Sequence, residues 1–375
     1  MEPWYLRVAA ATSFVLILGG TYWYYNRKLK FITSSKYTET STNQLLQLFH
    51  TSSTSSPKTI ALLIDNGSLR PASVISLRTM AAELQQRIHD RIPVIAASAR
   101  ISNRITKDEI EKAYSTLDHH NWSMLHHPIE QPLIVETAIQ RYYEQGYTHY
   151  LIIPAFLGPS ETITEYIPQI FKKFLSNSSK NYASLTYIIG KPLVNIPNIE
   201  KPITQIDEHT DTRIARILID HINQVWKNKT YQNPSIAICD HGSPSLEVSQ
   251  VRNYITNQVQ LLAPKVFPTV PRSITACSME RRPEKIYDFN EPLLETLLTT
   301  NTNYSSGEII VSLLFISPGK HAGSNGDIEN IIQNSIKENK TKGYSMDITM
   351  SPLLNSHPLL MDILVERIEE LLTEK

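Results

Sequence analysis

Residues 235–243, with the sequence Ser-Ile-Ala-Ile-Cys-Asp-His-Gly-Ser, decide how the chain is organised. An apolar run that favours a β-strand ends there at an Asp-His-Gly-Ser turn. The residues after the turn have the spacing of one helical face, which is formed by Val248, Val251, Ile255, Val259 and Leu262. A strand that ends in a turn and leads into a helix is typical of open α/β sheets, which bind ligands at the carboxyl ends of their strands.

The same alternation of apolar runs and helical patterns extends from residue 59 to the C-terminus and predicts parallel α/β sheets. The expected strands are Thr59–Ile64, Pro93–Ala97, His149–Pro154, Leu185–Ile189, Ser235–Cys239, Ser273–Cys277, Glu308–Phe315 and Met346–Met350. The expected helices are Ser73–Asp90, Leu133–Gln145, Glu165–Phe174, Asp211–Trp226, Ser245–Leu262, Pro292–Leu298, Asp327–Lys337 and Pro358–Leu372. This pattern predicts two tandem domains, 59–230 and 235–375, each a small parallel sheet flanked by helices.

The two predicted domains match each other in sequence at corresponding places. Residues 61–68, Ala-Leu-Leu-Ile-Asp-Asn-Gly-Ser, correspond to residues 236–243. Gln-Pro-Leu at 131–133 corresponds to Glu-Pro-Leu at 291–293. We infer an internal duplication with a repeat of about 140 to 170 residues, which is much longer than the repeats of solenoid proteins. The polar connection at 227–234 separates the two copies.

Residues 1–30 form a hydrophobic segment before the predicted domains. An apolar stretch at 8–20 is followed by clustered Tyr and Trp residues and then by basic residues, an order that suits a membrane anchor. A bipartite organelle-targeting signal is the alternative interpretation. Residues 31–58 are rich in Ser and Thr and predict a flexible linker.

The composition narrows the possible partners and cofactors. Lys plus Arg and Asp plus Glu each number 36, so the formal net charge is zero, which argues against nucleic acid as a partner. The chain has 2 cysteines, too few for a disulfide framework or an iron–sulfur cluster. The sequence has neither a Gly-rich dinucleotide motif nor a Walker loop, so no nucleotide is expected.

Three strands of the second predicted domain end in side chains that bind metals. His241 follows the first strand, Glu280 follows the second, and His321 follows the third. Because the carboxyl ends of parallel strands meet at one edge, we expect these side chains to converge. Two imidazoles and a carboxylate suit Fe²⁺, Co²⁺ or Zn²⁺. A single strand-end histidine is more often structural, but three ligands at successive strand ends favour a metal site.

The first predicted domain lacks these ligands at the matching positions, where it has Asn66, Arg100 and Thr162. A purely structural role would be needed in both copies. We therefore expect the three ligands to act as one unit and only the second domain to retain the chemistry. An insertion at 101–130 is either a polar surface loop or a metal-delivery segment. It carries His119, His120, His126 and His127.

Motifs at these strand ends resemble the CbiX/SirB family of sirohydrochlorin chelatases, which are class II tetrapyrrole chelatases. The motifs are Asp-His-Gly-Ser at 240–243, Ala-Cys-Ser-Met-Glu-Arg-Arg at 276–282, Tyr-Asp-Phe-Asn-Glu-Pro-Leu at 287–293 and Ser-Pro-Gly-Lys-His-Ala-Gly at 317–323. The resemblance is specific in the second half and degraded in the first. It implies two chelatase-like domains that face each other across a cleft and require no ATP.

The resemblance further implies that a divalent metal, Fe²⁺ or Co²⁺, is inserted as a substrate into sirohydrochlorin, in siroheme or cobalamin-type biosynthesis. Its functional residues correspond to His241, His321 and Glu280. One of the two histidines would be the metal ligand and the other the proton acceptor, in either order. The candidates for binding the polycarboxylate tetrapyrrole are Ser243, Arg281, Arg282 and Lys320. A non-catalytic, membrane-tethered carrier of tetrapyrrole or metal is the alternative function. An N-terminal signal before a tetrapyrrole enzyme makes a plastid the first expected location.

Overall fold

The computed structural model describes residues 57–115, 130–177, 182–196, 203–323 and 325–373. The predicted hydrophobic segment, nearly all of the predicted linker and the four histidines of the insertion lie outside these residues. Pro57–Lys375 forms one compact unit. Within the described part of the chain, every helix is too short or too polar to cross a bilayer.

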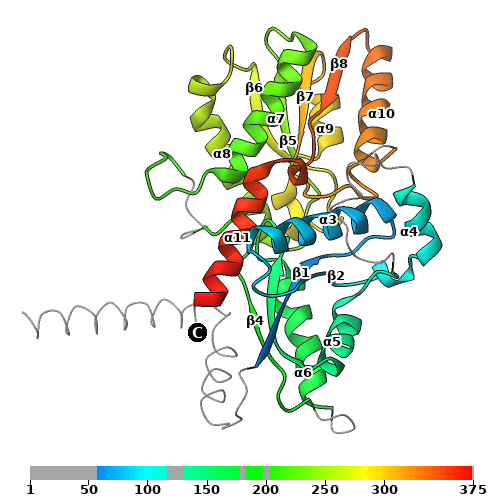
Figure 1. Ribbon diagram of the computed structural model, residues 1–375. Helices are drawn as coiled ribbons and strands as arrows, with labels where there is room; N and C mark the ends of the chain where they lie inside the picture. Colours follow the sequence, from blue (N-terminus) through cyan, green and yellow to red (C-terminus); the bar gives the residue numbers. More distant parts are fainter. Residues whose placement is uncertain (1–56, 116–129, 178–181, 197–202, 324, 374–375) are drawn as a thin grey trace, which may run out of the picture. The chain divides into compact units, whose positions relative to one another are not determined.

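Two parallel four-stranded sheets organise this unit, with the orders β2-β1-β3-β4 and β6-β5-β7-β8 (Figure 1). The strands are β1 (Lys58–Asp65), β2 (Val94–Ser98), β3 (Tyr147–Pro154), β4 (Thr186–Ile189), β5 (Ser235–Asp240), β6 (Ser273–Ser278), β7 (Gly307–Leu313) and β8 (Met346–Met350). The identical strand order in the two halves agrees with the inferred duplication. The prediction of two parallel α/β sheets is confirmed.

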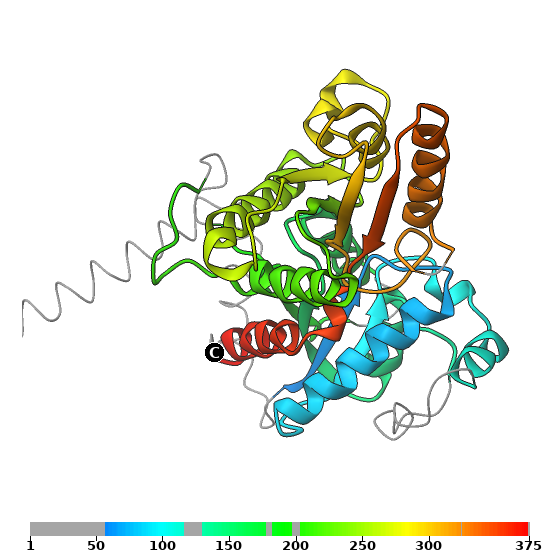
Figure 2. The ribbon, with the colours of Figure 1, turned by 90° about the horizontal axis from the view of Figure 1, so that it is seen from above.

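Helices flank both sheets (Figures 1 and 2). They are α3 (Pro71–Arg87), α4 (Lys107–Tyr114), α5 (Val135–Glu144), α6 (Ile167–Leu175), α7 (Arg213–Lys229), α8 (Leu246–Val266), α9 (Leu294–Thr300), α10 (Asp327–Thr341) and α11 (Pro358–Thr373). Short helical turns are η1 (Ser102–Arg104), η3 (Thr162–Tyr166), η4 (Lys285–Asn290) and η5 (Leu354–Ser356).

Helix α4 lies in the insertion at 101–130, so the interpretation of that insertion as a surface loop is wrong for residues 107–114. The helix starts with a capping box that the sequence analysis missed. Thr106 Oγ1 accepts a hydrogen bond from the Glu109 backbone N–H (3.3 Å), and the Glu109 carboxylate accepts one from the Thr106 N–H (2.7 Å).

The two faces of each sheet are buried in different hydrophobic cores. Ala61 and Leu63 of β1 lie in the same core as Ile236 and Ile238 of β5, which we call the shared core. The residues between them point the other way, into a separate core for each half, because side chains alternate along a strand. Each sheet therefore has one face covered within its own half and one face in the shared core.

The last helix of each half crosses to the other half. Helix α7, which ends the first half, packs on β7 and α8, and α11, which ends the chain, packs on α3 and β3. The two crossing helices also pack on each other and lie side by side in Figure 2. The domain boundary predicted between residues 230 and 235 remains a prediction. Helix α7, which precedes it, packs on the second half, and α11, which follows it, packs on the first.

Candidate functional site

The turn at residues 240–243 has a backbone that its glycine makes possible. Gly242 has a φ of +89°, and a Cβ on this residue would lie 1.9 Å from the Glu280 carbonyl oxygen. The Asp240 carboxylate accepts hydrogen bonds from the Gly242 N–H (3.1 Å) and from Ser278 Oγ (2.6 Å). This turn therefore places the residue between Asp240 and Gly242, which is His241, beside the end of β6.

Two buried side chains that the sequence analysis missed stabilise the turn at residues 240–243 through hydrogen bonds. Asn290 accepts a hydrogen bond from the Ser243 N–H (2.9 Å) and donates one to the Ser243 carbonyl oxygen (2.9 Å). Arg252 is 1% exposed, donates to Ser278 Oγ and to the Asn290 carbonyl oxygen, and lies 3.6 Å from Asp240 Oδ1. A charged residue on the apolar face of the predicted helix was the available signal for Arg252.

His241 has one ring nitrogen fixed and the other directed at a carboxylate. Nδ1 lies 2.9 Å from the Gly242 carbonyl oxygen, which only accepts, so Nδ1 carries the proton. Nε2 lies 3.4 Å from Glu280 Oε1. Both side chains are about half exposed, at 46% and 59%. A solute can therefore reach the space between them.

His321 lies against His241 and is oriented by an aspartate that the sequence analysis missed. The two imidazole centroids are 4.5 Å apart, with the rings at 68°. Nδ1 of His321 donates to Asp327 Oδ2 (2.7 Å), at the first turn of α10. Partial desolvation would raise the pKa of Asp327, but the hydrogen bond from His321 and the charge of Lys320 outweigh it and hold this pKa below its usual value.

The three predicted ligands are thus close in pairs. His241 touches both Glu280 and His321. Among the residues that the structure describes, however, no group of three or more His, Cys, Asp or Glu side chains is arranged to hold a metal ion. The use of all three as simultaneous ligands remains a prediction. Nearby Cys239 is fully buried, and its contact with Cys277 and its burial raise the pKa of the Cys239 thiol.

The predicted substrate-binding cations are largely engaged within the chain. Arg281 donates to Glu291 Oε1 (2.6 Å) and pairs with Asp288 at 3.2 Å. Arg282 donates to the Tyr287 hydroxyl (3.0 Å).

The other two predicted substrate-binding residues also have partners. Lys320 Nζ lies 3.6 Å from Asp327, although its side chain is 68% exposed. Ser243 Oγ accepts the Ser245 N–H (3.0 Å), a contact that stabilises the turn before α8. For all four of these residues, a role in substrate binding remains a prediction.

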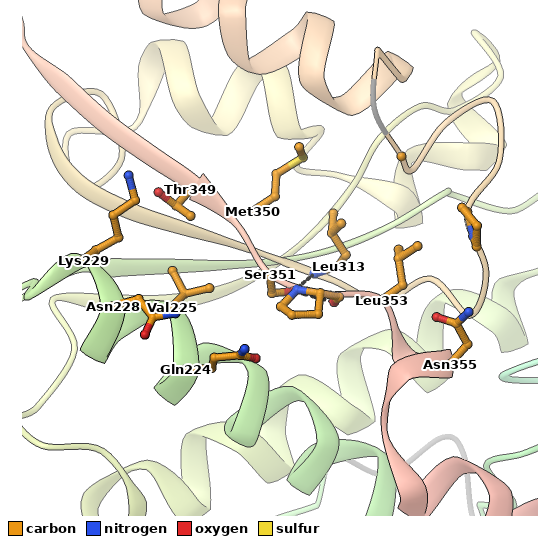
Figure 3. Close-up of a pocket in the computed structure, with 13 residues that line it drawn as sticks. Gln224, Val225, Asn228, Lys229, Leu313, Thr349, Met350, Ser351, Leu353 and Asn355 are labelled. Atoms are coloured by element: carbon orange, nitrogen blue, oxygen red, sulfur yellow. Dashed lines mark hydrogen bonds between the residues drawn. The ribbon is translucent and has the colours of Figure 1, made fainter. Parts of the chain in front are cut away.

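A cavity of about 670 Å³ lies beside the loop that carries His321. Figure 3 shows Val225 and Asn228 of α7 on one side and Met350 and Leu353 on the other. Pro318 and Gly323 of the His321 loop complete its wall, but His241, Glu280 and His321 do not line it. The cavity is therefore distinct from the cluster of predicted ligands.

The matching turn of the first half has the same backbone and different chemistry. Gly67 has a φ of +97°, and a Cβ there would lie 1.9 Å from the Arg100 carbonyl oxygen, just as Gly242 meets Glu280. Thr162 Oγ1 donates to Asn66 Oδ1 (3.0 Å), where the second half has its two histidine rings in contact. The structural correspondence of these positions supports the pairing inferred from sequence.

Comparison with known proteins finds a family match in the second half. Residues 235–371 match the family model CbiX, which confirms for this half the resemblance drawn from its motifs. No curated protein matches the chain.

Similar solved structures include SirB from Bacillus subtilis with Fe3+ (17% identity, TM-score 0.47, covering 84% of this chain and 95% of that one). They also include the sirohydrochlorin chelatase SirB from B. subtilis subspecies spizizenii in complex with cobalt (17%, 0.48, 84% and 94%). A third is DR2241 from Deinococcus radiodurans (9%, 0.43, 83% and 54%).

Proposed function

We propose that this chain, whose second half matches the CbiX family, is a chelatase that inserts Fe²⁺ or Co²⁺ into sirohydrochlorin. The observation that carries the proposal is the contact between His241 and His321. Each ring has its Nδ1 engaged by an acceptor in the chain, so each Nε2 is left to bind a metal or a proton.

We assign the metal to His241 and Glu280. Two ligands at about 2.1 Å from a tetrahedral metal are about 3.4 Å apart. His241 Nε2 and Glu280 Oε1 are separated by 3.4 Å. Two protein ligands would leave coordination positions open, which suits a metal that must pass on to the tetrapyrrole nitrogens.

We assign the proton acceptor to His321. Metal insertion releases two protons from pyrrole N–H groups, and a neutral imidazole is a suitable acceptor near neutral pH. Asp327 receives the Nδ1 proton of His321, which fixes the tautomer that presents a free lone pair at Nε2. The same hydrogen bond holds the ring in place while Nε2 takes up the proton.

Variants of the two histidines test this function. With sirohydrochlorin and Fe²⁺ or Co²⁺, followed by absorption spectroscopy, we expect His241→Ala and His321→Ala each to lower the insertion rate at least about 100-fold. His209→Ala removes an exposed histidine outside this cluster; it is the control and should change the rate little. No acceleration by the unaltered protein, with tight binding of the tetrapyrrole, would instead support a carrier.

The dependence of the insertion rate on metal concentration tests which residues bind the metal and which accept the proton. His241→Ala and Glu280→Gln should raise the metal concentration needed for half-maximal rate. Asp327→Asn should leave that concentration unchanged and lower kcat. An equal effect of all three variants on the metal dependence would contradict the assignment of His321 and Asp327 to proton transfer.

A further inference from the structure

The first half has hydrogen-bond donors where the second half has metal ligands. Its three matching residues are Asn66, Arg100 and Thr162. Glu280, which offers lone pairs to a cation, is matched by a guanidinium, which offers only N–H groups. This is a reversal of charge at one strand end, not merely the loss of a ligand. The reversed position suits an anion.

Arg100 is held in a geometry that suits a carboxylate. Its guanidinium carbon lies 4.0 Å from the centroid of the Tyr166 ring, and the guanidinium also donates a hydrogen bond to the Tyr166 hydroxyl, which leaves its other N–H groups for a ligand. Tyr166 is itself held by a hydrogen bond from its hydroxyl to Glu136 (3.4 Å). Among the described residues Arg100 forms no ion pair, whereas Arg281 of the second half pairs with two carboxylates.

Asn66 supplies a second donor at the end of the neighbouring strand, β1. Its Oδ1 accepts a hydrogen bond from the Thr162 hydroxyl at 3.0 Å, so its amide N–H groups remain as donors on an exposed residue. Thr162 is 7% exposed, so it fixes the amide from the buried side. An amide and a guanidinium that follow neighbouring strands supply the kinds of donor that bind carboxylates.

This donor pair lies near the predicted ligands of the second half. A Cβ on Gly319, two residues before His321, would lie 3.9 Å from Ser68 Oγ, two residues after Asn66. On the same loop, Ser317 Oγ lies 2.8 Å from Ser76 Oγ of α3. The loop that carries His321 therefore rests on the turn that carries Asn66.

Apolar side chains flank the strand ends of both halves. In the first half Leu69 is 56% exposed and Ile101, next to Arg100, is 37% exposed. In the second half Leu246 is 46% exposed and Ile286 is 74% exposed. Exposed apolar groups beside cationic donors suit a ligand with a flat apolar ring and carboxylate side chains.

We propose that Arg100 and Asn66 bind a carboxylate side chain of the tetrapyrrole, so that the first half positions the substrate while the second half supplies metal and proton acceptor. The inference rests on the proposed function but is tested by binding alone. Arg100 is a specificity-determining residue in this arrangement, because it favours tetrapyrroles with carboxylates at the ring edge.

Binding of metal-free porphyrins to the full-length protein tests the assignment. Uroporphyrin, whose side chains all end in carboxylates, is compared with mesoporphyrin, whose side chains are mostly alkyl. Arg100→Gln should raise the Kd for uroporphyrin about tenfold or more and change that for mesoporphyrin much less. Arg100→Lys should fall between, because it keeps the charge and loses the bidentate fork. Arg104→Gln removes an exposed arginine four residues after Arg100 and is the matched control.

Three results would overturn the proposal: equal Kd values for Arg100→Gln and Arg104→Gln, equal losses for the two porphyrins, or no uroporphyrin binding by the unaltered protein. Arg100-dependent binding without metal insertion would refute the proposed function and leave this inference standing. Insertion that depends on His241 but not on Arg100 would do the reverse.

Discussion

Asp65 and Asp240 occupy the same strand end in the two halves but have different electrostatic surroundings. Burial raises the pKa of Asp65 to about 6, although Ser98 donates a hydrogen bond to it, and among the described residues its Oδ1 has no hydrogen-bond partner. Burial also raises the pKa of Asp240, but there the positive charge of Arg252 opposes the shift. In the described part of the first half, no cation lowers the pKa of the Asp65 carboxylate as Arg252 lowers that of Asp240.

Replacing Asp65 should stabilise the protein at neutral pH. Because the folded-state pKa of about 6 exceeds the ordinary aspartate value of 3.8, the folded state binds more protons between these pH values. Stability is then lost as pH rises from about 4 to about 6, by up to about 3 kcal/mol. Asp65→Asn should remove this loss. The free energy of unfolding, measured by denaturant titration at pH 4 and pH 7.5, checks it.

Asp240→Asn, at the equivalent position of the second half, should instead destabilise the protein. It leaves the buried Arg252 guanidinium without its carboxylate, which should cost about 3–5 kcal/mol at pH 7.5. Stabilisation by both substitutions would mean that Arg252 contributes little, and destabilisation by both would mean that the Asp65 charge is compensated.

Each half uses a different element to hold its strand-end turn. In the second half η4 supplies Asn290, which binds both backbone polar groups of Ser243. In the first half η1 supplies Ser102, whose Oγ accepts the Ser68 N–H (3.0 Å) and donates to the Ser68 carbonyl oxygen (3.1 Å). The same two backbone groups are satisfied in both cases, which is why both turns keep the same shape.

Removing the η4 support should weaken both stability and activity. Asn290→Ala leaves Ser243 and the buried Ser249 hydroxyl without their partner, so we expect a loss of about 2–4 kcal/mol in unfolding free energy. The insertion rate should also fall, because the turn that positions His241 loosens. Ser102→Ala is the control, with a loss of stability and little effect on metal dependence. An unchanged rate in Asn290→Ala would show that His241 is positioned without η4.

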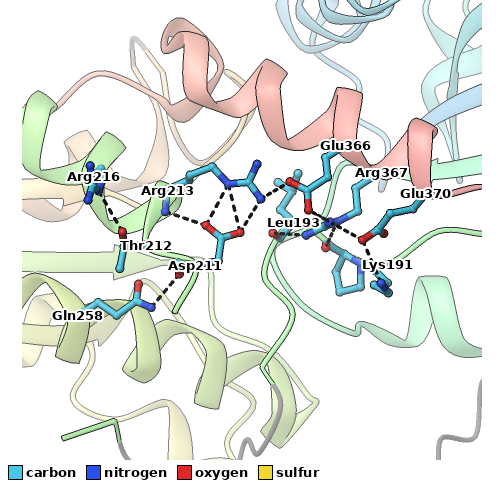
Figure 4. A network of polar contacts seen from close by, with 11 residues as sticks. Lys191, Leu193, Asp211, Thr212, Arg213, Arg216, Gln258, Glu366, Arg367 and Glu370 are labelled. Carbon is cyan, nitrogen blue, oxygen red and sulfur yellow. Dashed lines mark hydrogen bonds and ion pairs between the residues drawn. The ribbon is translucent and has the colours of Figure 1, made fainter. Parts of the chain in front are cut away.

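At the scale of the whole unit, the crossing of α11 ties the end of the chain to the first half. Figure 4 shows Arg367 donating to the Pro192 and Leu193 carbonyl oxygens, and Glu370 pairing with Lys191 at 3.0 Å. Arg213 of α7 pairs with Glu366 of α11 at 2.5 Å. The apolar face of α11 is buried in the shared core.

The second half alone should not form a stable folded monomer. A fragment of residues 235–375 lacks α7 over its sheet and exposes the α11 face, which carries Leu360, Leu364 and Ile368. We expect it to aggregate, unfold or pair with a second copy, as sedimentation and denaturant titration would show. Residues 57–375 serve as the control, with a single cooperative transition. A monomeric fragment that unfolds cooperatively would contradict the interlocked arrangement.

The candidate site was predictable only in part. The residues at strand ends, His241, Glu280 and His321, follow from the parallel-sheet pattern and from the comparison of the two copies. Asp327 was missed, because it starts a helix after the loop and gains its partner only when the loop folds back. Arg281 was predicted to be available to the substrate, but the approach of Glu291 depends on the path of η4, which has no strong sequence signal.

The sequence by itself determined the two parallel sheets, their order along the chain and the strand ends that carry the candidate chemistry. These depend on periods of two and of three to four residues, which local sequence records directly. Only the tertiary structure decided which sheet α7 and α11 cover, and which charges pair beneath and beside His241. The physical reason is that an apolar helix face fits either sheet equally well by pattern, and the choice is made by packing between residues far apart in the chain.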